Sequence, residues 1–256
     1  MFSVVTFAAE LGEIPGGLVV NSNSALFYKE ITPLKRDRHR GVRLNVASDR
    51  FEFSRGSSVI PALVDEFMTA SVHLPIVFMS GTDGFVPVFL VGLRTGLNAL
   101  LDADGGWTGE YIPAYLRRYP FIIGEVKGGE PIICIDETSA LLKDASGPAL
   151  FDEEGKESPA LTERIRFAND YYGAAQKNAA FVALLSELGL LHTVSIDAKF
   201  VAGDSVSLQG FMTVDAARLD QLSDEEFARL RKGGFLGPIY AHLASLSCVD
   251  RVRRLS

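Results

Sequence analysis

The longest periodic pattern in the chain runs from Leu161 to Leu191, and it constrains the fold more than any other feature. Within it, apolar and small residues recur at spacings of three and four, at Ala168, Tyr172, Ala175, Ala179, Val182 and Leu185. Residues at these spacings lie on one face of an α-helix. The pattern therefore predicts a long helix with this face turned inward, which Gly173 could break.

Short apolar runs characterise the first half of the chain. They are rich in Val, Ile and Phe and are bounded by turn residues, as is typical of β-strands. The predicted strands are Leu26–Ile31, Val42–Val46, Ile76–Met79, Val86–Gly92, Phe121–Val126 and Ile132–Ile135. Turns at Gly81–Gly84 and Lys127–Glu130 would join two pairs of them as hairpins. Helices are expected at Pro61–Ser71 and, in a short piece capped by Thr108, around Glu110–Arg118.

The C-terminal part is predicted to contain a strand pair followed by two helices. The strands are Val194–Val201 and Val206–Thr213, and the helices run from a capping-box sequence at Ser223 to Arg231 and from about Pro238 to Ser247. Taken together, the elements indicate an α+β fold. It would have a mainly antiparallel sheet in the N-terminal half and a helix-rich C-terminal half with one further hairpin.

One domain over residues 1–256 is the simplest organisation for a chain of this length. The best internal boundary is the acidic, turn-rich stretch 144–160. It would separate a strand-rich part, residues 1–143, from a helix-rich part, residues 161–256.

Composition excludes several classes of protein. The net charge of −7 argues against non-specific nucleic-acid binding, which requires a basic surface. The longest apolar runs, such as Val86–Val91, are far shorter than the roughly 20 residues of a membrane-spanning helix, so no membrane insertion is expected. The N-terminus lacks the features of a signal peptide, and the two distant cysteines, Cys134 and Cys248, are expected to be buried free thiols. These features favour a cytoplasmic location.

No motif for a metal or an organic cofactor is present. The four histidines include no pair at helical zinc spacing, and the chain has no Cys-x-x-Cys, no P-loop and no Gly-x-Ser-x-Gly elbow. Asp102 and Asp104 precede Gly105-Gly106 as in a calcium loop, but the remaining ligands are missing. A tight turn stabilised by an Asp side chain is the better interpretation. We therefore expect neither a metal nor a cofactor.

A dense cationic segment contains Arg36, Arg38, His39 and Arg40, and Arg43 follows it. Guanidinium groups bind carboxylates and phosphates through paired hydrogen bonds, so the segment could form an anion site. If it were extended, Arg36, Arg38 and Arg40 would share one face. The alternative is a solvated basic loop, or arginines paired with acidic residues of the chain.

A second dense segment combines aromatic residues with an arginine pair. Trp107, Tyr111, Tyr115 and Tyr119 could form a wall on which a ligand stacks, although large aromatic residues more often fill a core. Arg117 and Arg118 lie between the last two tyrosines.

Two carboxylates, Asp136 and Glu137, end an apolar strand, where they could perform acid/base chemistry. Adjacent strand residues point to opposite faces, so at most one of the two would enter a pocket shared with Arg117 or Arg118. A structural ion pair between an arginine and Asp136 is the simplest account.

Several of these segments, in this order and spacing, resemble the SapC family of bacterial proteins. The likeness is carried by Arg36–Arg40, by Trp107 with Tyr111–Phe121, by Ile133–Glu137, by Leu150–Gly155 and by Ile239–Leu246. Members of the family are described as associated with bacterial surface layers, and some are labelled as transport components. The resemblance implies an accessory or binding protein linked to surface-layer or envelope processes.

Two functional hypotheses follow. The first is a soluble binding protein whose partner is an anionic small molecule or a protein that the sequence does not identify. Its site would combine Arg36, Arg38, His39, Arg40, Trp107, Tyr111, Arg117, Arg118, Tyr119 and Asp136, with the first arginine segment facing the second. The charge of the arginines would be neutralised either by a bound anion or by acids such as Asp65, Asp136 and Glu137. The alternative is an enzyme acting on an anionic small molecule or peptide, with Asp136 or His39 as its acid/base group.

Overall fold

The structure is a computed structural model. It describes residues 3–4, 18–19, 25–45, 51–82, 84–126, 128–143, 147–200 and 205–256. The chain divides into two compact units. Unit 1 comprises Met1–Ala8, Phe51–Leu116 and Ala174–Ser256, and unit 2 comprises Ala9–Arg50 and Arg117–Gly173. Two of the crossings between the units fall within helices, α3 (Ala114–Arg118) and α4 (Pro159–Glu187).

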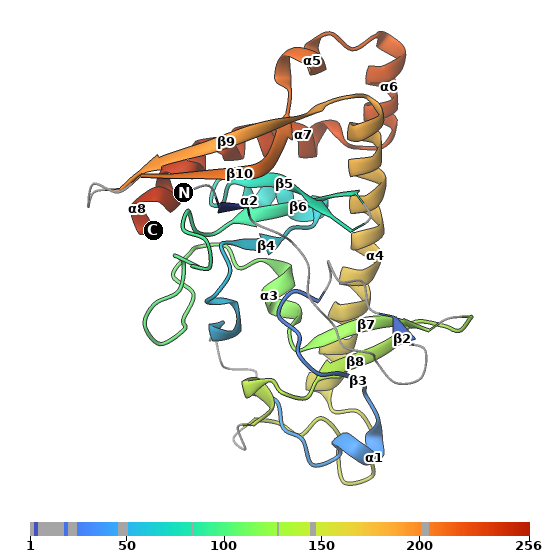
Figure 1. Cartoon of the computed structure of the whole chain (residues 1–256). Helices are drawn as coiled ribbons and strands as arrows, with labels where there is room; N and C mark the ends of the chain where they lie inside the picture. Colours follow the sequence, from blue (N-terminus) through green and yellow to red (C-terminus); the bar gives the residue numbers. More distant parts are fainter. Residues whose placement is uncertain are drawn as a thin grey trace. The chain divides into compact units, whose positions relative to one another are not determined.

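Unit 1 contains a six-stranded sheet (Figure 1). Its strands are β1 (Ser3–Val4), β10 (Ser205–Val214), β5 (Ile76–Gly81), β6 (Gly84–Leu90) and β4 (Val59–Pro61) in spatial order, with β9 (Leu191–Lys199) paired to β10. All pairs are antiparallel except that of β1 with β10. The predicted hairpins in these regions are confirmed as β5–β6 and β9–β10.

Besides the second part of α4, unit 1 contains several short helices. They are η2 (Glu52–Ser54), η3 (Val64–Glu66), α2 (Phe67–Ala70), α5 (Ala216–Asp220), α6 (Asp224–Lys232), α7 (Leu236–Ser245), η5 (Leu246–Cys248) and α8 (Val249–Leu255). The predicted capping box starts α6: Ser223 Oγ accepts from the Glu226 N–H, while the Glu226 carboxylate accepts from the Ser223 N–H. The structure thus confirms the two predicted C-terminal helices, as α6 and α7, and adds α5 and α8.

A buried histidine links α7 to the sheet of unit 1. The Nδ1 atom of His242 lies 2.9 Å from the Ile76 carbonyl oxygen, and Nε2 accepts a 3.0 Å hydrogen bond from the Val214 N–H. This pattern fits the neutral ring protonated on Nδ1. Burial lowers the pKa of His242 to about 4, although the hydrogen bond to Ile76 opposes the shift. The imidazole is therefore a structural connector between α7, β5 and β10.

Unit 2 contains a four-stranded antiparallel sheet (Figure 1). Its spatial order is β2 (Leu18–Val19), β7 (Phe121–Val126), β8 (Ile132–Asp136) and β3 (Ile31–Pro33). The remaining elements are α1 (Arg36–His39), η4 (Ala140–Leu142) and the first part of α4. The core gathers residues from the sheet, from α4, from the segment before α4 and from the segment after α1: Leu44, Phe121, Ile123, Ile135, Leu150, Phe151, Leu161 and Ala168. The fold class is α+β, as predicted.

Three predicted elements differ from the structure. Residues 25–30 form turns and bends rather than a strand, because the N–H groups of Lys29 and Glu30 donate to the Asp136 side chain instead of to a neighbouring strand. In the predicted strand Val42–Val46, only Arg43 forms a bridge, to Ala149, and Val46 lies outside the described residues. In the predicted helix 61–71, Pro61 belongs to β4, which is an edge strand and therefore tolerates a proline.

The long predicted helix is present as α4, and Gly173 does not interrupt it. The buried side differs in part from the expected face. Ala179 is exposed and Tyr172 is only partly buried, whereas Tyr171 and Phe181 are buried. The large aromatic side chains, rather than the small alanine, thus occupy the inward positions.

The two cysteines are buried and free, as expected. Among the described residues, no helix is both long and apolar enough to cross a membrane.

Candidate functional site

The cationic segment 36–40 forms a single helical turn, α1, directly after β3. It is therefore not extended, and Arg36, Arg38 and Arg40 do not follow the alternation of a strand. His39 is the inward-facing residue of the turn, with 2% of its surface exposed. Its Nε2 atom lies 2.8 Å from Glu137 Oε1, and its Nδ1 atom lies within 3.0 Å of both the amide nitrogen and the carbonyl oxygen of Lys35. Both ring nitrogens thus have partners in either protonation state.

Glu137 neutralises part of this segment. Its carboxylate accepts hydrogen bonds from Arg38, from His39 and from Thr32 Oγ1, the last at 3.0 Å. Burial alone would raise the pKa of Glu137, but these hydrogen bonds outweigh it and lower the pKa below its ordinary value. Arg38 and His39 therefore serve to fasten α1 to the end of β8.

Asp136, the neighbouring carboxylate, is completely buried. It accepts hydrogen bonds from the N–H groups of Lys29 (2.9 Å), Glu30 (3.2 Å) and Thr138 (3.0 Å). The hydroxyls of Thr138 (2.7 Å) and Tyr119 (3.3 Å) also donate to it. These bonds hold the 25–30 segment and the turn after β8 in place.

Arg118 belongs to the same buried region, with 4% of its surface exposed. Its guanidinium carbon lies 4.2 Å from the ring centroid of Tyr171 and 5.5 Å from that of Tyr28, in the geometry of cation–π contacts. Burial raises the pKa of Tyr28, and the nearby Arg118 opposes that shift. We call Tyr28, Arg118, Tyr119, Asp136 and Tyr171 the buried polar cluster.

The remaining predicted site residues lie elsewhere. Arg117 is exposed, with its guanidinium carbon 5.1 Å from the Phe167 ring centroid. Arg40 is exposed and makes no hydrogen bond or ion pair within the described part of the chain.

Trp107 and Tyr111 belong to unit 1 and stabilise one loop there. Trp107 is partly buried, and its Nε1–H donates to the Tyr111 carbonyl oxygen at 3.0 Å. The Tyr111 hydroxyl in turn donates to Glu66 Oε1 at 2.7 Å. In the same loop, Asp102 Oδ1 accepts from the N–H groups of Asp104 and Gly106, which confirms the predicted turn. Across the described residues, no group of three or more His, Cys, Asp and Glu side chains could hold a metal ion.

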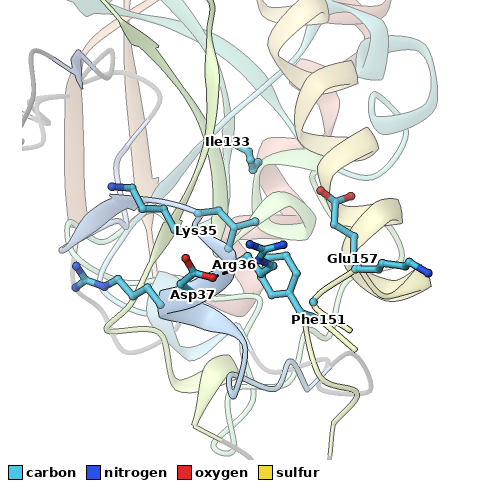
Figure 2. Close-up of a pocket in the computed structure, with 10 residues that line it drawn as sticks. Lys35, Arg36, Asp37, Ile133, Phe151 and Glu157 are labelled. Carbon is cyan, nitrogen blue, oxygen red and sulfur yellow. Dashed lines mark hydrogen bonds and ion pairs between the residues drawn. The ribbon is translucent and has the colours of Figure 1, made fainter. Parts of the chain in front are cut away.

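A pocket of about 800 Å³ lies in unit 2 beside α1 (Figure 2). It is lined by Leu34, Lys35, Arg36, Asp37, Arg38, Ile133, Phe151, Gly155, Lys156 and Glu157. Three of these residues, Leu34, Ile133 and Phe151, provide an apolar floor, and the others are charged or glycine. The predicted cationic segment thus forms one side of the pocket, and the 151–157 loop forms the second side.

Sequence reasoning assigned Leu150–Gly155 to the family likeness and residues 144–160 to a domain boundary, but it did not place the 151–157 loop in the site. A large aromatic residue, Phe151, within this polar stretch was the available signal. Gly155 was the second signal, because glycine is common where the chain adopts a positive φ. In the structure its φ is +80°. A Cβ atom at this position would lie 2.5 Å from Arg36 Cδ, so Gly155 makes room for the Arg36 side chain.

Most charges around the pocket are already paired. Arg38 bonds Glu137, Lys156 Nζ lies 2.7 Å from Glu154 Oε2, and Arg36 Nε lies 3.2 Å from Asp37 Oδ1. The terminal nitrogens of Arg36, by contrast, make no hydrogen bond within the residues that the structure describes. Figure 2 shows the Arg36 side chain directed toward the Phe151 ring, whereas the Lys35 side chain points away from it. The arrangement can offer two parallel N–H donors to an oxyanion above an apolar floor.

The comparisons with known proteins identify a family. The SapC family model matches residues 34–252. The chain belongs to the SapC family. No curated protein and no solved structure matches it. The SapC match includes residues of both units and every residue that lines the pocket.

Proposed function

We propose that this SapC-family protein binds a small molecule with an anionic group, such as a carboxylate or a phosphate, in the pocket beside α1. The observation that carries the proposal is Arg36, whose terminal nitrogens have no partner among the described residues while its side chain borders an apolar floor. A guanidinium fork matches the geometry of a carboxylate or a phosphate. The volume of about 800 Å³ lies within the range of small-molecule sites.

An accessory role in surface-layer or envelope processes, which the family resemblance implies, is the cellular setting that we propose. The enzymatic alternative has less support. Its acid/base groups, His39 and Asp136, have their polar side-chain atoms engaged in hydrogen bonds, and neither lines the pocket. A binding role therefore accounts better for the site.

The proposal can be tested by thermal unfolding in acetate or phosphate, compared with chloride at matched ionic strength. Binding to the folded state raises the melting temperature by mass action, so acetate or phosphate should stabilise the wild type more than chloride does. Arg36→Gln should abolish this extra stabilisation. Arg40→Gln is the matched control, because Arg40 is an exposed arginine of the same segment that does not line the pocket. Equal responses in all three proteins would contradict the proposal.

A further inference from the structure

The 151–157 loop, which forms the second side of the pocket, is closed by hydrogen bonds between its two ends. Phe151 and Glu157 are directly opposite each other in an antiparallel bridge. The Asp152 N–H donates to the Lys156 carbonyl oxygen at 2.9 Å, and Asp152 Oδ1 accepts from the Lys156 N–H at 2.8 Å. Residues that face each other across an antiparallel bridge project to the same side. The Glu157 side chain is therefore held on the side of the loop that carries the Phe151 ring.

Glu157 is the acidic counterpart of Arg36 in this pocket. Asp37 lies beside Arg36 Nε, whereas the Glu157 carboxylate makes no hydrogen bond or ion pair with any described residue. Protein groups therefore do not fully satisfy Arg36 and Glu157, with Leu34, Ile133 and Phe151 alongside. The Lys35 ammonium group also has no partner among the described residues, but its side chain points away from the Phe151 ring (Figure 2). Glu157 would repel a ligand that carries only negative charge.

We infer that the ligand is a zwitterion with apolar side chains, of the class of hydrophobic amino acids and short peptides. Its carboxylate binds the Arg36 guanidinium, its ammonium group binds the Glu157 carboxylate, and its apolar groups cover Leu34, Ile133 and Phe151. This inference rests on the proposed function and specifies the ligand class of the same site. The volume of about 800 Å³ exceeds what one amino acid fills, so a dipeptide is the appropriate probe.

The first experiment compares four dipeptide probes by NMR titration of the labelled protein. The probes are Leu-Leu, N-acetyl-Leu-Leu, Leu-Leu amide and Gly-Gly. Removing the ammonium charge by acetylation should weaken binding about two- to fivefold, as expected for an exposed ion pair. Removing the carboxylate as the amide should weaken it about tenfold, because the paired Arg hydrogen bonds are lost. Gly-Gly should bind at least about tenfold more weakly, because its side chains bury no apolar surface.

The second experiment assigns each ligand charge to a protein residue by a double-mutant cycle. Glu157→Gln should weaken the binding of Leu-Leu but not that of N-acetyl-Leu-Leu, which can only gain from the loss of a like charge. Arg36→Gln should likewise weaken the binding of Leu-Leu but not that of Leu-Leu amide. Glu153→Gln is the control, since Glu153 is an exposed acid of the same loop that does not line the pocket. It should leave every titration unchanged.

The outcomes separate this inference from the proposed function. If N-acetyl-Leu-Leu binds at least as well as Leu-Leu while Arg36→Gln weakens both, the pocket binds anions and the zwitterion inference is wrong. If no dipeptide binds while acetate still raises the melting temperature through Arg36, the inference again fails alone. If neither the binding of dipeptides nor the rise in melting temperature with acetate depends on Arg36, both proposals are overturned.

Discussion

Two regions of unit 2 use arginine in opposite ways. In the buried polar cluster, Arg118 is enclosed by Tyr28 and Tyr171, and the nearby Asp136 accepts hydrogen bonds from the surrounding backbone. In the pocket, Arg36 is largely exposed and only its Nε atom has a partner among the described residues. The comparison teaches that residue type does not decide the role. Burial and the number of partners distinguish an arginine that stabilises the fold from one that is open to a ligand.

The largest effect is expected at Asp136. Asp136→Ala removes the acceptor of three partly buried N–H hydrogen bonds. Each unsatisfied buried donor costs about 1–3 kcal/mol, so the free energy of unfolding should fall by about 4 kcal/mol or more in urea titrations. Asp37→Ala, a change at an exposed acid near the pocket, is the control and should cost less than about 0.5 kcal/mol. A similar small effect at both positions would remove the contrast between the two regions.

Burial also decides the role of a histidine in unit 1, and there it makes the stability of the fold depend on pH. The pKa of His242 is lowered to about 4 in the folded protein, against 6.5 for the exposed side chain. Between these values the unfolded chain binds the proton and the folded protein does not. The neutral His242 ring therefore contributes fully to the free energy of unfolding above pH 6.5. This contribution, about 3 kcal/mol in total, is lost as the pH falls toward 4.

The His242 prediction can be checked by NMR titration of the histidine ring resonances. The His242 ring should remain neutral down to about pH 5 while the protein stays folded. A titration midpoint near 6.5 would show that the ring is not held between Ile76 and Val214 as described.

An intermediate effect is expected at Arg118. Arg118→Lys keeps the charge but replaces the planar group that lies between two tyrosine rings. The free energy of unfolding should fall by about 1–2 kcal/mol, as expected for desolvated cation–π contacts. Arg117→Lys is the matched control, because Arg117 is exposed, and its effect should stay within about 0.5 kcal/mol. An equal loss in the two variants would mean that burial does not distinguish the adjacent arginines.

Strand and helix positions followed well from the sequence where local pattern decides them. The capping box at Ser223 and the short apolar runs of β5, β6, β7 and β8 are local signals, and they gave elements close to those observed. Residues 25–30 could not be predicted in the same way. Their conformation depends on hydrogen bonds to Asp136, which lies about a hundred positions away in the chain.

The site was only partly accessible to sequence reasoning for a similar reason. The clustering of Arg36, Arg38 and His39 was visible, but their different roles depend on Glu137, which pairs with two of them and not with Arg36. Phe151 and Glu157 line the pocket because their loop packs beside α1, and no local sequence pattern predicts that packing. The sequence therefore pointed to the cationic segment that lines the pocket, and not to the 151–157 loop.

The smallest effect on stability is expected at Arg36. Arg36→Gln should change the free energy of unfolding by less than about 0.5 kcal/mol, because the side chain is exposed and its ion pair with Asp37 lies at the surface. Urea titration of the variant without added anion checks this. A loss as large as that of Arg118→Lys would place Arg36 among the structural arginines.

The most direct test is an acetate titration of the ¹⁵N-labelled protein at constant ionic strength, with backbone amide shifts followed residue by residue. The largest saturable shifts should lie at residues 34–38 and 151–157. They should disappear in Arg36→Gln but not in Arg40→Gln. Shifts that do not saturate, or that persist in Arg36→Gln, would contradict the claim that this pocket binds an anion through Arg36.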